Sequence, residues 1–126
     1  MTSLMMRLLG AVILTIGIES LVLTPIFLPY ASNRRKLILN VILINVITNI
    51  TLNLILVVVD FRILETKMLH RMRWFLILLG ELLIPLLEAF LYEQGDLQIG
   101  RKRVIETCYL ANALSFGVGA VGGMIW

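Results

Sequence analysis

The sequence predicts an all-α integral membrane protein, folded as a compact bundle of four transmembrane helices. Of its 126 residues, 60% are hydrophobic and the mean hydropathy is +0.97, whereas roughly half of a typical soluble domain is apolar. A helix needs about 20 mainly apolar residues to cross the hydrocarbon core of a bilayer. The sequence holds four such runs, which use most of its length. We therefore expect residues 1–126 to form a single transmembrane domain.

The first two predicted spans cover about residues 4–28 and 37–59. The first run is too long for a signal peptide, contains Glu19 and lacks a small-x-small cleavage site before Pro25. A short basic loop at 31–36 follows it. The second run is rich in Ile, Val and Leu, but its unbroken length favours a helix over a strand.

The third and fourth predicted spans cover about residues 74–92 and 104–126. A charged loop at 60–73, which we expect to contain a short amphipathic segment at the lipid headgroups, precedes the third span. In the fourth span small residues recur at every fourth position, a spacing that lets helix backbones approach closely. This pattern predicts packing against a neighbouring helix or a second copy of the chain, and so a homo-oligomer or a larger membrane complex. The residues are Ala111, Ser115, Gly119 and Gly123.

Carboxylate and amide side chains occur inside all four spans. Glu81 and Glu88 are seven residues apart in the third span and therefore lie on nearly the same helix face. At about 1.5 Å per residue, they and Glu19 of the first span lie roughly 12–22 Å from the surface on the side of the termini. The other two spans carry amides at similar depths, which predicts one polar band buried between the helices. These amides are Asn45, Asn49, Asn53 and Asn112.

The buried carboxylates lack a nearby basic partner. Apart from Arg7 near the start of the first span, the four spans contain no Lys, Arg or His. An ionised carboxylate at a helix centre costs on the order of 2.5–3.5 kcal/mol. Protonation, a bound cation with asparagine oxygens among its ligands, or a water-filled cavity would each reduce this cost. All three are typical of proton- or cation-linked transport or ion binding, but a static hydrogen-bonded core fits the same residues.

Other classes of function find less support. The sequence contains no H-E-x-x-H, G-x-S-x-G, P-loop or Cys-x-x-Cys motif, which leaves the question of an enzyme open but leans against one. The single cysteine, Cys108, excludes an internal disulfide and a cysteine-based metal site, and no cofactor is evident beyond a bound proton or cation. The basic residues lie in short loops, which argues against nucleic-acid binding. An accessory subunit of a larger membrane complex is the main alternative, and an intramembrane enzyme acting on lipid is a weaker one.

Two basic triplets flank the second and fourth spans on one side of the membrane. They predict either binding of anionic lipid headgroups or ordinary anchors that fix the topology of the chain. The six residues are Arg34, Arg35, Lys36, Arg101, Lys102 and Arg103.

The polar pattern resembles that of uncharacterised small four-span bacterial membrane proteins. The resemblance lies in the stretch from Asn45 to Asn53 (N-x-x-T-N-x-x-x-N), in the two glutamates of the third span, and in Asn112-Ala-Leu-Ser115-Phe116. Members often have proline after the Thr-Asn pair, where this chain has Ile50. The resemblance implies a bacterial cytoplasmic membrane and a shared polar core, but no activity. The size and Glu19 are also similar to those of small multidrug-resistance dimers, as an architectural analogy.

Overall fold

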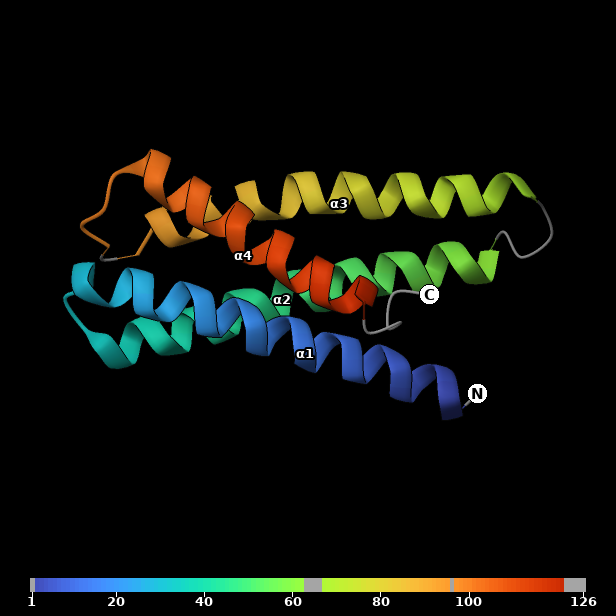
Figure 1. Cartoon of the computed structure of the whole chain (residues 1–126), viewed down its shortest axis with the longest axis horizontal. Coiled ribbons are helices and arrows are strands. Elements are labelled where there is room, and N and C mark those ends of the chain that lie inside the picture. Colours follow the sequence, from blue (N-terminus) through green and yellow to red (C-terminus); the bar gives the residue numbers. More distant parts are fainter. Residues whose placement is uncertain (1, 63–66, 96, 122–126) are drawn as a thin grey trace.

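The structure, a computed structural model, describes residues 2–62, 67–95 and 97–121 and confirms the predicted fold class. Four long helices follow one another along the chain with alternating direction (Figure 1). Each is long and apolar enough to cross a membrane, so the chain is an integral membrane protein. The helices are α1 (Thr2–Phe27), α2 (Arg34–Arg62), α3 (Lys67–Glu93) and α4 (Arg101–Val121), and a short 3-10 helix, η1 (Leu28–Tyr30), follows α1.

The helices extend beyond the predicted spans. Both basic triplets form first turns of helices instead of loops. A side-chain cap precedes the triplet in α2, where Asn33 Oδ1 accepts a hydrogen bond from the backbone N–H of Lys36 at 3.1 Å. In α4 the backbone hydrogen bonds begin at Gly100 O, which accepts from the N–H of Arg103 at 2.9 Å. The predicted loop at 60–73 is helical in its described part, since extending an existing helix is inexpensive. Residues 63–66, and residues 122–126 of the predicted fourth span, lie outside the described residues.

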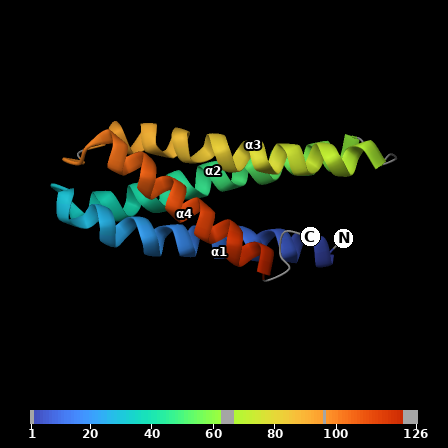
Figure 2. The ribbon, with the colours of Figure 1, turned by 45° about the horizontal axis from the view of Figure 1, so that its top comes forward.

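Each helix packs extensively against two others. The helices α1 and α3 both contact α2 and α4, which places α1 and α3 at opposite corners of the bundle. The connections α1–α2 and α3–α4 lie together at one end, which we call the loop end (Figure 1). There the N–H of Gln98 donates to Tyr30 O at 3.0 Å. A second view shows that α1, α2 and α3 run roughly along one direction and that α4 is inclined to them (Figure 2).

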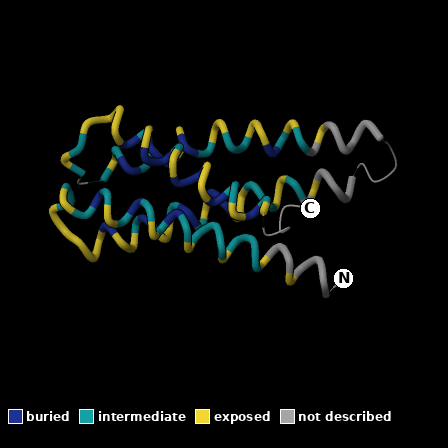
Figure 3. The backbone as a smooth tube through the Cα atoms, in the orientation of Figure 1, coloured by how far each residue is buried: buried dark blue, intermediate teal, exposed yellow. Residues whose placement is uncertain are grey.

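The buried residues lie mainly in the half of the bundle nearest the loop end (Figure 3). The apolar core there includes Leu23 and Phe27 of α1 and Val41 of α2, all 0% exposed. The Phe27 ring meets the Tyr92 ring edge-on, with their centroids 5.2 Å apart. Large apolar side chains such as Phe90 remain exposed on the outer faces, where a membrane protein contacts lipid. The packed half therefore surrounds the depth at which the polar band was predicted.

Replacing Phe27 with alanine should destabilise the bundle by on the order of 2 kcal/mol, because the cavity left behind costs about 24 cal/mol per Å³. Thermal unfolding in detergent would measure this. Phe90→Ala is the matched control and should have little effect, since that ring is 52% exposed. Equal effects of the two changes would contradict the placement of the core.

Candidate functional site

Two uncharged side chains hold the carboxyl group of Glu88 at the centre of the bundle. Glu88 lies on α3 and is 0% exposed. Thr48 of α2 contacts one carboxyl oxygen, with 2.8 Å between Oγ1 and Glu88 Oε1. Asn112 of α4 donates from Nδ2 to the other oxygen, Oε2, at 2.8 Å. The carboxyl group thus joins three helices.

The carboxyl group of Glu19 on α1 has equivalent partners. Glu19 is also 0% exposed. Ser115 of α4 lies with its Oγ 2.9 Å from Glu19 Oε1, and Asn49 of α2 donates from Nδ2 to Oε2 at 3.3 Å. This carboxyl group too joins α2 and α4 to its own helix.

Between the two arrangements, α2 and α4 exchange the roles of amide donor and hydroxyl donor. Glu19 receives its amide from α2 and its hydroxyl from α4, whereas Glu88 receives its hydroxyl from α2 and its amide from α4. Because α1 and α3 stand at opposite corners, both carboxyl groups point into the region between α2 and α4. We call this set the central polar layer; it consists of Glu19, Thr48, Asn49, Glu88, Asn112 and Ser115.

The orientation of both layer amides is fixed by a second acceptor. Asn49 Nδ2 also donates to Asn45 O at 2.9 Å, and Asn112 Nδ2 also donates to Cys108 O at 3.0 Å. Rotating either amide by 180° would place its oxygen against two acceptors. Both amides therefore present N–H groups, and not oxygens, to the carboxyl groups.

Three of the predicted site residues lie outside this layer. Glu81 is half-buried, two turns before Glu88 on α3, and takes no part in the hydrogen bonds of the layer. Asn53 donates to Asn49 O of its own helix at 2.8 Å. Asn45 is 0% exposed, yet neither polar atom of its side chain has a partner among the described residues. The structure thus brings together Glu19, Glu88, Asn49 and Asn112 and leaves Glu81, Asn53 and Asn45 apart.

The small residues of α4 face the chain's own bundle. Ala111, Ser115 and Gly119 are buried, and the extensive contacts of α4 are with α1 and α3. Gly123 lies outside the described residues. The stripe therefore serves packing within one chain, and Ser115 also contributes its hydroxyl to the layer. The other side of α4, with Leu114, Gly117 and Val118, borders an open apolar hollow.

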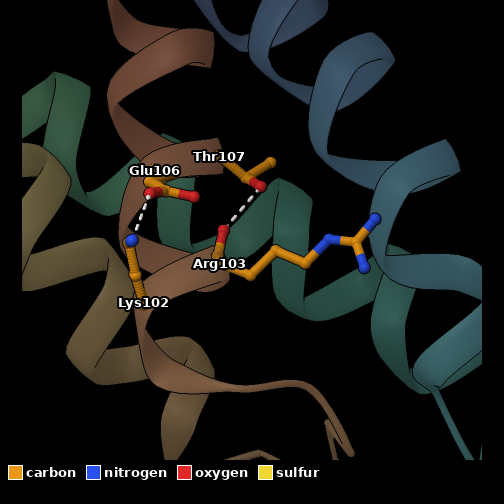
Figure 4. Close-up of polar contacts among 4 residues, drawn as sticks. All are labelled: Lys102, Arg103, Glu106 and Thr107. Carbon is orange, nitrogen blue, oxygen red and sulfur yellow. Dashed lines mark hydrogen bonds and ion pairs between the residues drawn. The ribbon is translucent and has the colours of Figure 1, made fainter.

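The basic triplets lie together at the loop end, in the first turns of α2 and α4, and all six residues are exposed. Arg103 Nη1 donates to Tyr30 Oη at 2.8 Å, and its guanidinium lies 5.4 Å from the centre of that ring. Arg101 pairs with Glu93 at 3.2 Å. Lys102 lies 3.8 Å from Glu106, one turn along α4 (Figure 4).

Sequence reasoning assigned Ser115 to packing alone and gave Thr48 no site role. Their positions in the sequence could have identified them as site residues, because Thr48 adjoins Asn49, and Ser115 follows Asn112 by three residues on the same face of α4. No group of three or more His, Cys, Asp or Glu that could hold a metal ion occurs in the described part of the chain.

Comparison with protein-family models, curated proteins and solved structures finds no match to this chain.

Removing the Thr48 hydroxyl with Thr48→Val should destabilise the bundle by about 1 kcal/mol, within the range of hydrogen bonds between transmembrane helices. A double-mutant cycle with Glu88→Leu should give a coupling of similar size. Thr107→Val is the matched control, because Thr107 Oγ1 bonds to Arg103 O of its own helix at 2.7 Å (Figure 4). A cycle with no coupling between Thr48 and Glu88 would contradict the layer.

Proposed function

We propose that this protein binds and releases protons at Glu19 and Glu88 and that this exchange carries protons across the membrane. The observation that carries the proposal is that each carboxyl group contacts a hydroxyl with a second acceptor. Thr48 Oγ1 lies 2.8 Å from Glu88 Oε1 and 3.0 Å from Ile44 O. Ser115 Oγ lies 2.9 Å from Glu19 Oε1 and 2.9 Å from Asn112 O.

This geometry accommodates both protonation states of each carboxyl group. A hydroxyl has one proton to donate. When the carboxyl group is ionised, the hydroxyl donates to it. When the carboxyl group is protonated, it donates to the hydroxyl oxygen, and the hydroxyl proton turns to the backbone carbonyl. Neither state leaves a buried donor without an acceptor, so a proton can arrive or depart with the helices in place.

The layer favours a proton over a metal cation. Oxygen atoms are the ligands of hard cations, but Asn49 and Asn112 turn their N–H groups towards the carboxyl groups. A cation between the carboxylates would meet these donors and not amide oxygens. A proton, by contrast, requires only the hydroxyl rearrangement.

The same geometry gives less support to the other candidate functions. Glu19 and Glu88 are 0% exposed, so neither touches a lipid as an intramembrane lipid enzyme would require. For an accessory subunit, the layer would need only hydrogen bonds, which glutamine supplies without an ionisable group.

The proposed location is a bacterial cytoplasmic membrane, on the basis of the sequence resemblance. Arg34 and Arg35 at the loop end fit anionic headgroups there.

Infrared spectra of the purified protein, recorded over a series of pH values, should show buried carboxyl groups that gain and lose a proton reversibly. Glu19→Gln and Glu88→Gln should each remove part of this signal, because glutamine keeps the shape and hydrogen bonds but not the ionisable proton. Glu106→Gln is the control, since that side chain is 63% exposed beside Lys102. Carboxyl signals that do not respond to pH would refute proton binding.

In proteoliposomes with an imposed pH gradient, the protein should increase the rate at which the gradient decays, as read by an enclosed pH-sensitive dye. Glu19→Gln and Glu88→Gln should return the rate to that of empty vesicles, whereas Glu106→Gln should retain the wild-type rate. Titrating carboxyl groups without any change in flux would restrict the function to proton binding and refute transport of protons alone.

A further inference from the structure

A small cavity opens at the loop end, between the first turn of α2 and the connection from α3 to α4. Its polar lining includes Asn33, Lys36 and Asn40, and Tyr92 of α3 also lines it. Its volume of about 20 Å³ is sufficient for one water molecule, which needs at least 10–15 Å³ by this kind of measure. The cavity thus brings solvent from the loop end to the side of Tyr92.

Tyr92 has an unsatisfied hydroxyl. The residue is 2% exposed, and its hydroxyl has no hydrogen-bond partner among the described residues. Burial of such a group without a partner is costly, so a buried hydroxyl ordinarily hydrogen-bonds to another group or to water. Tyr92 lies one helical turn after Glu88 on the loop-end side of the central polar layer.

Asn45 of α2 lies at the same depth in the bundle as Tyr92 of α3. The two helices run antiparallel, and two contacts fix their register: Thr48 with Glu88, and the Asn40 amide beside Gly95. Asn45 and Tyr92 both fall between these contacts. Asn45 also has both side-chain polar atoms buried and unpaired in the described structure.

We propose that Asn45 and Tyr92 bind water and, with the loop-end cavity, form the route by which Glu88 exchanges protons with that face of the membrane. Their three unpaired polar atoms match the two to four partners that a buried water requires. The proton passes from the Glu88 carboxyl group to this water, leaving a carboxylate that accepts a hydrogen bond from the Thr48 hydroxyl, and the water passes a proton on to solvent in the cavity. The route rests on the proposed proton-binding function.

The titratable groups around the route come from all four helices. Glu88 and Tyr92 belong to α3, Glu19 to α1 and Cys108 to α4, and Lys36 of α2 stands at the cavity. Phenol and thiol groups are ordinarily neutral at pH 7, so the proton acceptors at this depth are the two carboxyl groups and water. The charge of Lys36 at the mouth favours release of the proton to bulk solvent over its retention there.

The test is the rate of hydrogen–deuterium exchange of the Glu88 carboxyl group after transfer of the purified protein to D₂O. The carboxyl band is identified by its loss in Glu88→Gln. Tyr92→Phe and Asn45→Leu should each slow the exchange roughly tenfold, as a barrier raised by one lost hydrogen bond predicts. Tyr109→Phe is the matched control, because the Tyr109 hydroxyl already donates to Leu82 O at 2.7 Å, away from the route.

The outcomes separate the two proposals. If the wild-type Glu88 band does not respond to pH or exchange at all, proton binding itself is refuted. If Glu88 titrates and exchanges at the same rate in wild type, Tyr92→Phe and Asn45→Leu, the route is refuted and proton binding stands. Asn40→Leu provides a second variant, since a side chain of similar size that cannot hydrogen-bond to water in the cavity should slow exchange without altering Tyr92 or Asn45.

Discussion

A carboxyl group at the middle of a bilayer has no bulk water around it, and in this bundle it has no basic side chain in its hydrogen-bonding shell. The packing is arranged around that constraint. Glu19 and Glu88 stand on diagonally opposed helices, and the side chains that hydrogen-bond to their carboxyl groups come from α2 and α4. Each of those two helices must therefore present an amide and a hydroxyl at one depth. This requirement sets the register of every helix against its neighbours.

The short side chains of α4 follow from the same requirement. A serine hydroxyl extends only a short distance from its backbone, so Ser115 reaches Glu19 at 2.9 Å only if α1 and α4 lie close together. Ala111 and Gly119, one turn to either side, permit that approach because they add little volume at the interface. The small residues that let α4 pack closely and the serine that contacts Glu19 therefore belong to the same stripe of this helix.

Depth along the helices made part of the layer predictable. Counting 1.5 Å per residue placed Glu19, Asn49, Glu88 and Asn112 at similar levels, and the structure joins them. Periodicity also placed Glu81 on the face of Glu88, but it carries no information on where helices separate. The helices α1 and α3 diverge away from the loop end (Figure 1), and Glu81 is left half-buried.

Which hydroxyl meets which carboxyl group depends on the register between helices far apart in the chain. Thr48 and Glu88 are separated by 40 positions, and no local pattern relates them. The first residues of α2 and α4 show a different limit of prediction from the sequence. Both triplets were predicted to lie in loops, and basic residues in a first turn do oppose the helix dipole. The Asn33 cap outweighs that local preference in α2.

The choice of glutamate over glutamine is what a purely structural role leaves unexplained. At either position a glutamine oxygen could accept from the asparagine amide. Its NH₂ group could donate to the hydroxyl, which would turn to its backbone carbonyl. Glutamine would thus make the same contacts without an ionisable group that costs on the order of 2.5–3.5 kcal/mol when charged. Each interhelical hydrogen bond contributes only about 0.6 kcal/mol on average, so the two bonds to one carboxylate do not offset that cost. The property that glutamate adds is a proton that can leave, and this is the property on which the proposed function depends.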